Sequence, residues 1–186
     1  MCSSDLATGY VNPVINEDAP DPSVIRADDG TYYLYATQRG NNVVPVYSSK
    51  NLTNWTFLGS VFNDATYPSQ ARVGLPGNVW ACDGNYVDGK YLLYYSKSEW
   101  GGEWTCGLAV SVADKPEGPY TNPTKLFDSS EIGVQNSIDP FFIEEDGHKY
   151  IFWGSFRGIY GIELSDDGMA VKTGATKKKK IGRAHV

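Results

Sequence analysis

The sequence predicts an all-β fold made of three similar units, arranged as part of a β-propeller. Three glycines, Gly30, Gly89 and Gly147, each follow an aspartate and lie between two short runs of β-branched and aromatic residues. A run, a tight Gly-containing turn and a second run are typical of a β-hairpin. The glycines are spaced by 59 and 58 residues. A regular period of this length, with several short strands per unit, is typical of propellers and solenoids.

Each unit is expected to contain four strands. The opening hairpins are residues 21–25 with 31–36, 83–87 with 91–95, and 139–143 with 150–153. Third and fourth strands are expected at 43–49 and 55–59, at 107–112 and after 120, and at 159–164 and 169–171. Loops at 63–78 and at about 128–136 connect the units, and the length of the first favours a functional loop. The pattern indicates no helix of useful length. Three four-stranded units amount to about three blades, fewer than known propellers contain.

The composition favours a globular protein that binds a neutral ligand. Of the 186 residues, 13% are aromatic and 20% are charged, which is unlike a disordered or a membrane protein. No apolar run approaches the ~18 residues that are needed to cross a bilayer. The formal net charge of -6 argues against nucleic acid, which binds basic patches. We therefore expect no nucleic acid and no membrane as partners.

Both ends of the chain are expected to be foreign to the protein. Residues 1–6 and 177–186 correspond to translations of a common short-read sequencing adapter, read as its reverse complement at the start and after an adenine run at the end. The alternative is a genuine basic tail. Residues 7–176 are then the protein's own segment, a partial propeller domain, and we expect the gene to continue past both ends. This segment contains Cys82 and Cys106, which could pair in an oxidising compartment; we expect free thiols.

Three aspartates hold corresponding places in the three units. Asp21, Asp83 and Asp139 each stand at the head of the first strand. The first strand of a propeller blade lies nearest the axis, so these side chains are expected to meet at one mouth of the central channel. Carboxylates that crowd together repel one another, which favours a chemical role. The alternative is that each aspartate only caps a turn before a strand.

Carboxylates beside aromatic side chains suit glycoside hydrolysis. This reaction needs one carboxylate as general base or nucleophile and one carboxylic acid with a raised pKa. Sugar rings could stack on aromatic faces, although each candidate taken singly fits core or loop packing better, Trp153 above all. The candidates are Trp80, Trp100, Trp104, Trp153 and Phe156.

Other chemistries have less support. His148 is the one histidine within residues 7–176 and lies in a hairpin turn, so a His-based triad or a zinc site is not indicated. The sequence contains no Gly-rich phosphate loop or dinucleotide fingerprint. We expect no required cofactor and no metal ligands. A structural calcium ion on the carboxylates is conceivable, although no EF-hand loop is present.

Four segments carry a resemblance to a known family. They are Ala19-Pro20-Asp21-Pro22-Ser23, Trp80-Ala81-Cys82-Asp83, Asn136-Ser137-Ile138-Asp139-Pro140 and Trp153-Gly154-Ser155-Phe156-Arg157-Gly158-Ile159. In this order they resemble the motifs of glycoside hydrolase family 43, and within it the arabinan-degrading enzymes. The resemblance spans nearly all of residues 10–172. It implies a five-bladed propeller that hydrolyses plant cell-wall arabinans, arabinoxylans or xylans with inversion.

The resemblance also implies roles for single residues. Asp21 is the expected general base that activates water, and Asp139 the second aspartate, which orients the general acid and tunes its pKa. The general acid is expected on a glutamate of the next blade, outside this chain. Glu117 lies in a Gly-Pro turn and is not expected to replace it. Substrate contacts are expected from Trp80, Asp83, Asn136, Ser155 and Phe156.

Some expectations concern the protein as a whole. Cys82 stands where the family usually has proline, which we expect to alter the substrate wall. We expect this chain to be inactive alone, and its parent protein to be a secreted or periplasmic monomer that binds an oligo- or polysaccharide. The main alternative is a carbohydrate-binding propeller without catalysis. A protein-interaction propeller of the WD40 or kelch kind is a third interpretation, but the signatures of those repeats are absent.

Overall fold

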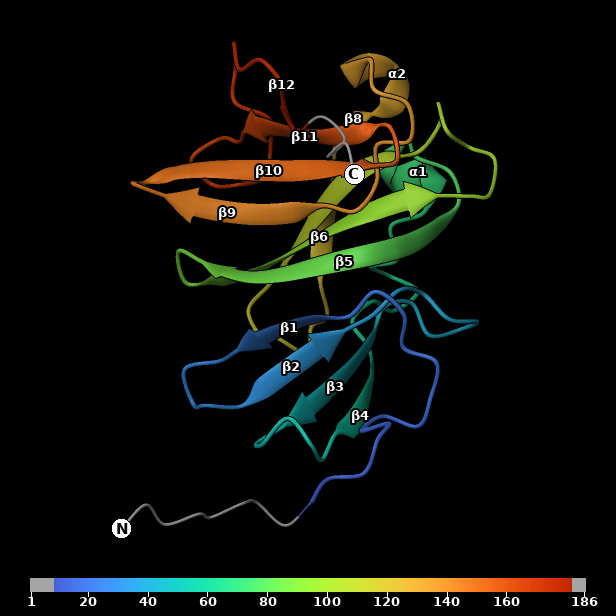
Figure 1. Cartoon of the computed structure of the whole chain (residues 1–186), viewed down its shortest axis with the longest axis vertical. Helices are drawn as coiled ribbons and strands as arrows, with labels where there is room; N and C mark the ends of the chain where they lie inside the picture. Colours follow the sequence, from blue (N-terminus) through green and yellow to red (C-terminus); the bar gives the residue numbers. More distant parts are fainter. Residues whose placement is uncertain (1–8, 182–186) are drawn as a thin grey trace.

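The computed structural model describes residues 9–181 and has three antiparallel four-stranded sheets that follow one another along the chain (Figure 1). We call these sheets blades one, two and three. Blade one consists of β1 (Ser23–Arg26), β2 (Tyr32–Tyr35), β3 (Pro45–Ser49) and β4 (Thr56–Ser60). Blade two consists of β5 (Asn78–Val87), β6 (Lys90–Ser98), β7 (Gly107–Ala113) and β8 (Thr121–Asp128). Blade three consists of β9 (Phe141–Glu145), β10 (His148–Ser155), β11 (Gly158–Glu163) and β12 (Lys178–Ile181). Two four-residue helices, α1 (Gln70–Val73) and α2 (Ser129–Ile132), lie in the connections between blades.

The predicted hairpins are confirmed, and their turn residues explain why they form. In blade two, Asp88 and Gly89 have φ angles of 49° and 82°, and in blade three Asp146 and Gly147 have φ angles of 52° and 75°. Two successive residues with positive φ make the turn whose twist matches that of the strands it joins, and Asp-Gly adopts it readily. These turns fix the register of the β5–β6 hairpin in blade two and of the β9–β10 hairpin in blade three.

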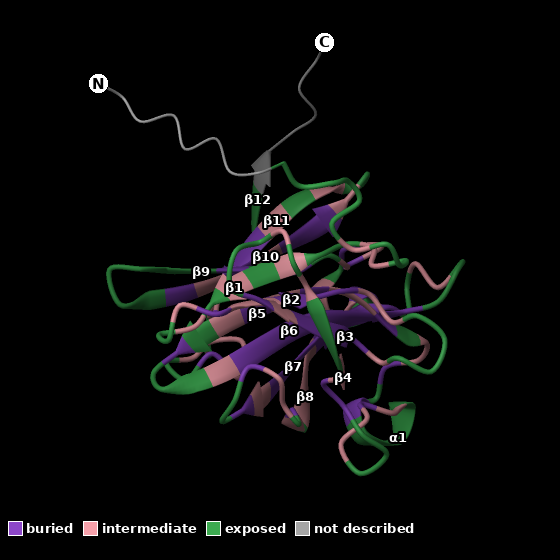
Figure 2. Ribbon diagram, turned by 90° about the horizontal axis from the view of Figure 1, so that it is seen from below, coloured by how far each residue is buried: buried purple, intermediate pink, exposed green. Residues whose placement is uncertain are grey.

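The middle blade is covered on both faces, and the outer blades on one. Within blade two, β6 is buried from Leu92 to Ser98 and most of β7 is buried as well. By contrast, four of the five residues of β9 are exposed. Figure 2 shows the buried residues gathered on the central sheet, with exposed residues toward both outer sides. The inner strands β1 and β9 both contact β5, the inner strand of blade two (Figure 1).

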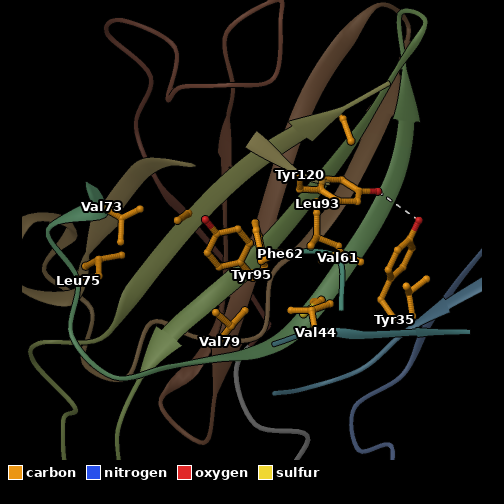
Figure 3. Close-up of a cluster of buried hydrophobic side chains, with 14 residues drawn as sticks. Tyr35, Val44, Val61, Phe62, Val73, Leu75, Val79, Leu93, Tyr95 and Tyr120 are labelled. Atoms are coloured by element: carbon orange, nitrogen blue, oxygen red, sulfur yellow. Dashed lines mark hydrogen bonds between the residues drawn. The ribbon is translucent and has the colours of Figure 1, made fainter. Parts of the chain in front are cut away.

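Aromatic rings fill the space between blades one and two (Figure 3). Tyr35 and Tyr120 meet edge to face with ring centroids 6.2 Å apart, and their hydroxyl oxygens are 3.2 Å apart. Phe62 packs against both Tyr95 and Tyr120. The Tyr35 hydroxyl also donates to Pro116 O at 2.8 Å. Buried tyrosines need such partners for their hydroxyl groups, and these contacts join blade one to the outer half of blade two.

The end of blade three differs from the expectation. Met169–Val171 was expected to finish this unit, but Val171 makes only an isolated bridge with Leu164. Asp167 accepts hydrogen bonds from Ser165 Oγ and from Met169 N, so Met169 and Ala170 are part of a turn and not of a strand. The fourth strand is β12, within the segment 177–186 that the sequence analysis set aside. The foreign origin of the two ends stays a prediction, and residues 1–8 and 182–186 lie outside the described residues.

Two further expectations can be compared with the structure. Cys82 and Cys106 are both buried and free, which confirms the expectation of free thiols. Among residues 9–181, no helix is long and apolar enough to cross a membrane.

Candidate active site

Each inner strand is entered through a residue in the left-handed region of backbone conformation. These residues are Asp21, Ala81 and Asp139, with φ angles of 52°, 42° and 60°. Non-glycine residues seldom adopt this region, and those that do are often found at functional sites. In blades one and three, the residue is an aspartate followed by proline.

This register corrects one part of the sequence analysis. Asp21 and Asp139 correspond to each other, as predicted, because each stands two residues before the first paired residue of its hairpin. Asp83 does not correspond to them, since it lies two residues farther along, inside β5, and Ala81 occupies the equivalent position. The cause is a shift in the pairing of β5 with β6 between Trp80 and Asp83. Sequence spacing alone does not reveal such a shift.

Asp21 and Asp139 stand at the starts of the inner strands of blades one and three, and we call this end of the stacked blades the mouth. Asp139 is exposed at the surface, and partial burial of its carboxyl group raises the pKa of this group. The negative charge of Asp21 raises the pKa of Asp139 further. Such an effect requires two neighbouring carboxyl groups. The structure therefore brings together the two aspartates that the sequence analysis proposed as the base and its partner.

Asp21 is exposed, and Thr37 holds its carboxylate. Thr37 follows β2, and its hydroxyl Oγ1 donates to Asp21 Oδ2 at 2.7 Å. The same oxygen accepts a hydrogen bond of 2.7 Å from the backbone N–H of Ala81. In addition, Thr37 N donates to Pro20 O at 3.0 Å. Blade two therefore contacts the residue whose hydroxyl donates to Asp21 in blade one.

The backbone around Asp139 is fixed by two neighbouring strands. Asp139 N donates to Ser96 Oγ of blade two at 2.8 Å. Gly154 N donates to Ile138 O at 2.9 Å within blade three. No hydrogen bond to the Asp139 carboxylate is made within the part of the chain that the structure describes. Asp139 is therefore held through its main chain, whereas Asp21 is held through its side chain as well.

Asn136 and Ser155, both predicted to bind substrate, contact each other. The side-chain amide of Asn136 donates to Ser155 Oγ at 2.8 Å, and Asn136 N donates to Glu103 O at 2.7 Å. The Glu103 carboxylate also pairs with Arg157 Nη2 at 3.3 Å. These contacts join the loop 99–106 of blade two to the hairpin that follows β10.

Asp83 touches the inner strands of all three blades. Its Oδ1 accepts a hydrogen bond of 3.3 Å from Ser23 Oγ in β1, and its Oδ2 accepts one of 2.8 Å from Phe142 N in β9. Asn85 Nδ2 donates to the same oxygen at 2.9 Å. Burial raises the pKa of Asp83, although the three hydrogen bonds act in the opposite direction. Two of the three hydrogen bonds to the carboxylate of this predicted substrate residue therefore join blade two to its neighbours.

Aromatic side chains lie in β5 and in the loops that follow β6 and β10, at the same end of the blades as Asp21 and Asp139. Trp80 and Trp100 pack with ring centroids 5.3 Å apart, and Trp100 is 94% exposed. Phe156 is also exposed, with the Arg157 guanidinium carbon 5.0 Å from its ring centroid. Trp104 is half-exposed. Large apolar faces left in water are typical of ligand or partner sites.

Trp153 and Cys82 lie in the core. Trp153 is buried, as expected, and its Nε1 donates to Ser137 Oγ at 3.1 Å. Cys82 is buried between blades one and two with its thiol 3.8 Å from Ala36 O, and burial raises the pKa of this thiol. Because its side chain is buried, Cys82 does not line an exposed wall, and the prediction that it alters the substrate wall is wrong in this respect. Its side chain packs inward.

Glu117 lies away from the mouth. It stands between β7 and β8, and its negative charge raises the pKa of Tyr33 in β2, after burial has raised it more. Tyr33 is near the turn of the first hairpin, at the other end of blade one from Asp21. This position agrees with the expectation that Glu117 is not the general acid.

Three residues that were not expected from the sequence contact the predicted site residues. Thr37 lies two residues after Tyr35, the partner of Ser23, and Ser96 lies two residues after Tyr94, the partner of Asp83. The two positions are therefore equivalent, and the recurrence of a hydroxyl residue there is a usable signal. Glu103 holds Asn136 through a backbone carbonyl group, a contact that its side-chain type does not indicate.

Within residues 9–181, no three His, Cys, Asp or Glu side chains form a metal site, and the calcium expectation stays a prediction.

Residues 10–184 match the sequence model of glycosyl hydrolases family 43. The chain belongs to this family. It is 37% identical over 169 residues to the arabinan endo-1,5-alpha-L-arabinosidase A of Aspergillus niger, a match that covers 87% of this chain and 50% of that protein. It is 28% identical over 189 residues to a beta-xylosidase of Formosa agariphila, covering 89% of this chain and 30% of that protein. The alpha-L-arabinanase of Cellvibrio cellulosa, solved with arabinohexaose, superposes with a TM-score of 0.70 and 26% identity, over 90% of this chain and 55% of that chain.

These comparisons confirm the family 43 resemblance drawn from the four motifs. They also confirm the fold class, because solved family 43 structures align with the stack of three sheets. The chain spans about half the length of the Aspergillus niger relative. The three blades therefore correspond to part of a family 43 propeller.

Proposed function

We propose that the protein to which this chain belongs is an inverting glycoside hydrolase that acts on arabinan or arabinoxylan. The observation that carries the proposal is the meeting of Asp21 and Asp139 at one mouth, where the charge of Asp21 raises the pKa of Asp139. Aromatic faces beside this mouth suit sugar rings. Membership of family 43 supports the same reaction class.

In this proposal, Asp21 is the general base. It is exposed to water and oriented by Thr37, which suits a carboxylate that takes a proton from an attacking water molecule. Asp139 is the second aspartate, which orients the general acid and tunes its pKa. The general acid is a glutamate from a part of the protein outside this chain. An inverting site separates its acid and base by about 6.5–9.5 Å so that water fits between them.

The substrate class follows from the relatives. Two of the three similar proteins carry arabinan-cleaving names and the third is a beta-xylosidase, so we place arabinan first and xylan-type chains second. Trp80, Asn136, Ser155 and Phe156 are the proposed substrate contacts around the mouth. Asp83 would reach substrate only by giving up its contacts between blades.

Further proposals concern the protein as a whole. We propose that it is a secreted or periplasmic monomer that needs no cofactor, and that the 186-residue chain alone lacks hydrolase activity because the general acid is absent. Glu103 is paired with Arg157 and Glu117 lies away from the mouth, so neither is a ready substitute.

The test is release of reducing sugar from linear arabinan and from arabinoxylan. The 186-residue chain and the longer protein from the same locus would be compared with the Asp21→Asn variant of the longer protein. We expect release by the longer protein, a loss of about 100- to 10,000-fold in Asp21→Asn, and none from the chain alone. Release by the chain alone, or an active Asp21→Asn variant, would show that the proposed assignment of roles is incorrect.

A second candidate is a carbohydrate-binding propeller without catalysis. The exposure of Trp100 and Phe156 favours it, because stacking on sugar requires no general acid. Binding of arabino-oligosaccharides by the longer protein without any release of sugar would support this candidate.

A further inference from the structure

We propose that Thr37 is a positioning residue for Asp21 and that a backbone N–H of blade two directs the proton of its hydroxyl. This inference rests on the proposed function, because it concerns the residue to which we assign the part of general base. It is carried by the hydrogen bonds that meet at Thr37 Oγ1.

The first step is the direction of the hydroxyl proton. A threonine hydroxyl has one proton to donate and two lone pairs that can accept. Ala81 N–H donates to Thr37 Oγ1 at 2.7 Å, which occupies one lone pair. Asp21 Oδ2 lies 2.7 Å from the same oxygen and, as a carboxylate, can only accept. The proton of Thr37 must therefore point at Asp21.

The second step is what this bond does for Asp21. Because Asp21 is exposed, its side chain would otherwise be free to sample several staggered rotamers. A hydrogen bond to an ionised group is shorter and stronger than one between neutral groups. Thr37 also binds the residue before Asp21, since Thr37 N donates to Pro20 O at 3.0 Å. Backbone and side chain of one residue therefore fix both the path of the chain and the orientation of the carboxylate.

The third step is the comparison with the other blades. Ser96 holds the place of Thr37 in blade two, and its hydroxyl accepts from Asp139 N at 2.8 Å. In blades two and three, the residue equivalent to Asp21 thus donates its backbone N–H to a hydroxyl group of the preceding blade. In blade two, however, the head residue is Ala81, so Ser96 has no carboxylate of its own blade to orient.

In blade three, the equivalent position is Gly154. A Cβ atom there would lie 2.1 Å from Gly158 O, so no side chain fits and no hydroxyl can reach Asp139 from this position. Asp139 is left with a pKa raised by burial and by Asp21, while Asp21 has a dedicated donor. This asymmetry distinguishes two aspartates that otherwise occupy equivalent places, and it suits a fixed base beside a partner that affects the acid.

The test compares Thr37→Val with Thr37→Ser. Valine has nearly the shape of threonine but no hydroxyl, whereas serine keeps the hydroxyl and loses a methyl group. Thr121→Val is the matched control, because Thr121 Oγ1 donates to Val112 O at 3.3 Å far from the mouth. Unfolding in urea would show whether each variant is folded before it is used.

The first readout does not depend on activity. Three-bond couplings between the backbone nitrogen and the side-chain carboxyl carbon of Asp21, measured by NMR in this chain, report its rotamer. We expect one rotamer in the unchanged chain, in Thr37→Ser and in Thr121→Val, and averaged couplings in Thr37→Val. Exchange of the Ala81 amide proton should also accelerate in Thr37→Val. A single unchanged Asp21 rotamer in Thr37→Val would overturn the inference.

The second readout uses the longer protein from the same locus. We expect Thr37→Val to lower kcat about 10- to 100-fold with little change in KM, since a misoriented group costs rate, and Thr37→Ser to stay within about threefold. A Thr37→Val variant with unchanged kcat would overturn the inference. An unchanged protein that releases no sugar overturns the proposed function instead, and the Asp21 rotamer then decides the positioning role on its own.

Discussion

The carboxylate of Asp83 accepts a hydrogen bond of 2.8 Å from the backbone N–H of Phe142. This contact ties the inner strand of blade two to that of blade three. Ser23 Oγ, from the inner strand of blade one, donates to the other carboxylate oxygen. One half-buried side chain therefore joins three blades, and we interpret its role as the stabilisation of their stacking.

Replacing Asp83 should destabilise the fold. Asp83→Ala leaves the buried N–H of Phe142 without its partner, and unpaired buried groups cost about 1–3 kcal/mol each. We expect the free energy of unfolding, measured in urea, to fall by about 3 kcal/mol. Asp114→Ala is the control: it removes an exposed pair with Lys90, and water screens such a pair so well that stability should change little. Unchanged stability in Asp83→Ala, with a loss of sugar binding, would favour the substrate role expected from the motif.

Replacing Ala81 by glycine should stabilise the protein. Ala81 has a φ angle of 42°, a conformation that glycine adopts without a clash of its Cβ atom. The left-handed region costs a residue with a Cβ about 1–2 kcal/mol, so we expect a gain of about 1 kcal/mol in urea unfolding. Ala109→Gly, in the buried strand β7, should lose stability instead. A loss of stability in both variants would contradict this account.

Lys97 should make stability depend on alkaline pH. Its side chain is buried, its amine donates to Gly77 O and lies 5.2 Å from the ring centroid of Tyr67. Burial lowers the pKa of Lys97 to about 8 from its ordinary value of 10.5. Between these values the unfolded chain binds a proton that the folded chain has released, so the free energy of unfolding should rise with pH, by up to about 3 kcal/mol.

The variant Lys97→Met isolates this effect, because the tyrosines titrate in both proteins. The measurement is the difference in unfolding free energy between the two proteins at pH 7.5 and at pH 10. Relative to Lys97→Met, the unchanged protein should gain stability at the higher pH. A difference that does not vary with pH would mean that Lys97 titrates normally.

Removing the charge of Asp21 should lower the pKa of Asp139. The negative charge of Asp21 helps to raise that pKa, after burial, so Asp21→Asn should shift the titration of Asp139 toward lower pH while leaving it above the ordinary value. The carboxyl carbon resonance of Asp139, followed by NMR across the acid range, gives the shift directly. Asp18→Asn, which removes an exposed partner of Arg39, should leave the titration unchanged. An identical Asp139 titration in Asp21→Asn would place the two carboxyl groups too far apart to act together.

Trp100 should contribute to sugar binding and little to stability. Its side chain is 94% exposed and packs only on one side against Trp80. We expect Trp100→Ala to weaken binding of arabinohexaose to the longer protein by about tenfold, measured by calorimetry in the Asp21→Asn background. Phe57→Ala, on the outer strand of blade one, should bind as before. Equal affinity in Trp100→Ala would remove this tryptophan from the site.

The hairpins and the paired aspartates could be predicted from the sequence because local chemistry determines them. Asp-Gly turns specify tight hairpins wherever they stand between strand-forming runs. The repeated Asp-Pro at Asp21 and Asp139 marked the equivalent heads of two strands correctly. Trp153, within an apolar run, was correctly placed in the core.

The rest depends on contacts that residue types do not reveal. Because the pairing of β5 with β6 shifts between Trp80 and Asp83, Ala81 and not Asp83 occupies the position equivalent to Asp21 and Asp139. Backbone groups make several of the bonds around the mouth, such as Glu103 O with Asn136 N, and any residue type could supply them. The last strand of blade three, β12, was not predicted because residues 177–186 were set aside as foreign to the protein.

The central claim is that these blades belong to an inverting hydrolase whose base is Asp21. The most direct measurement is proton NMR of the first product that the longer protein releases from linear arabino-oligosaccharide, before the anomers equilibrate. The account predicts a newly formed end of inverted configuration, and no such product from Asp21→Asn. A product that retains the configuration, or an Asp21→Asn variant that still inverts at the normal rate, would contradict it.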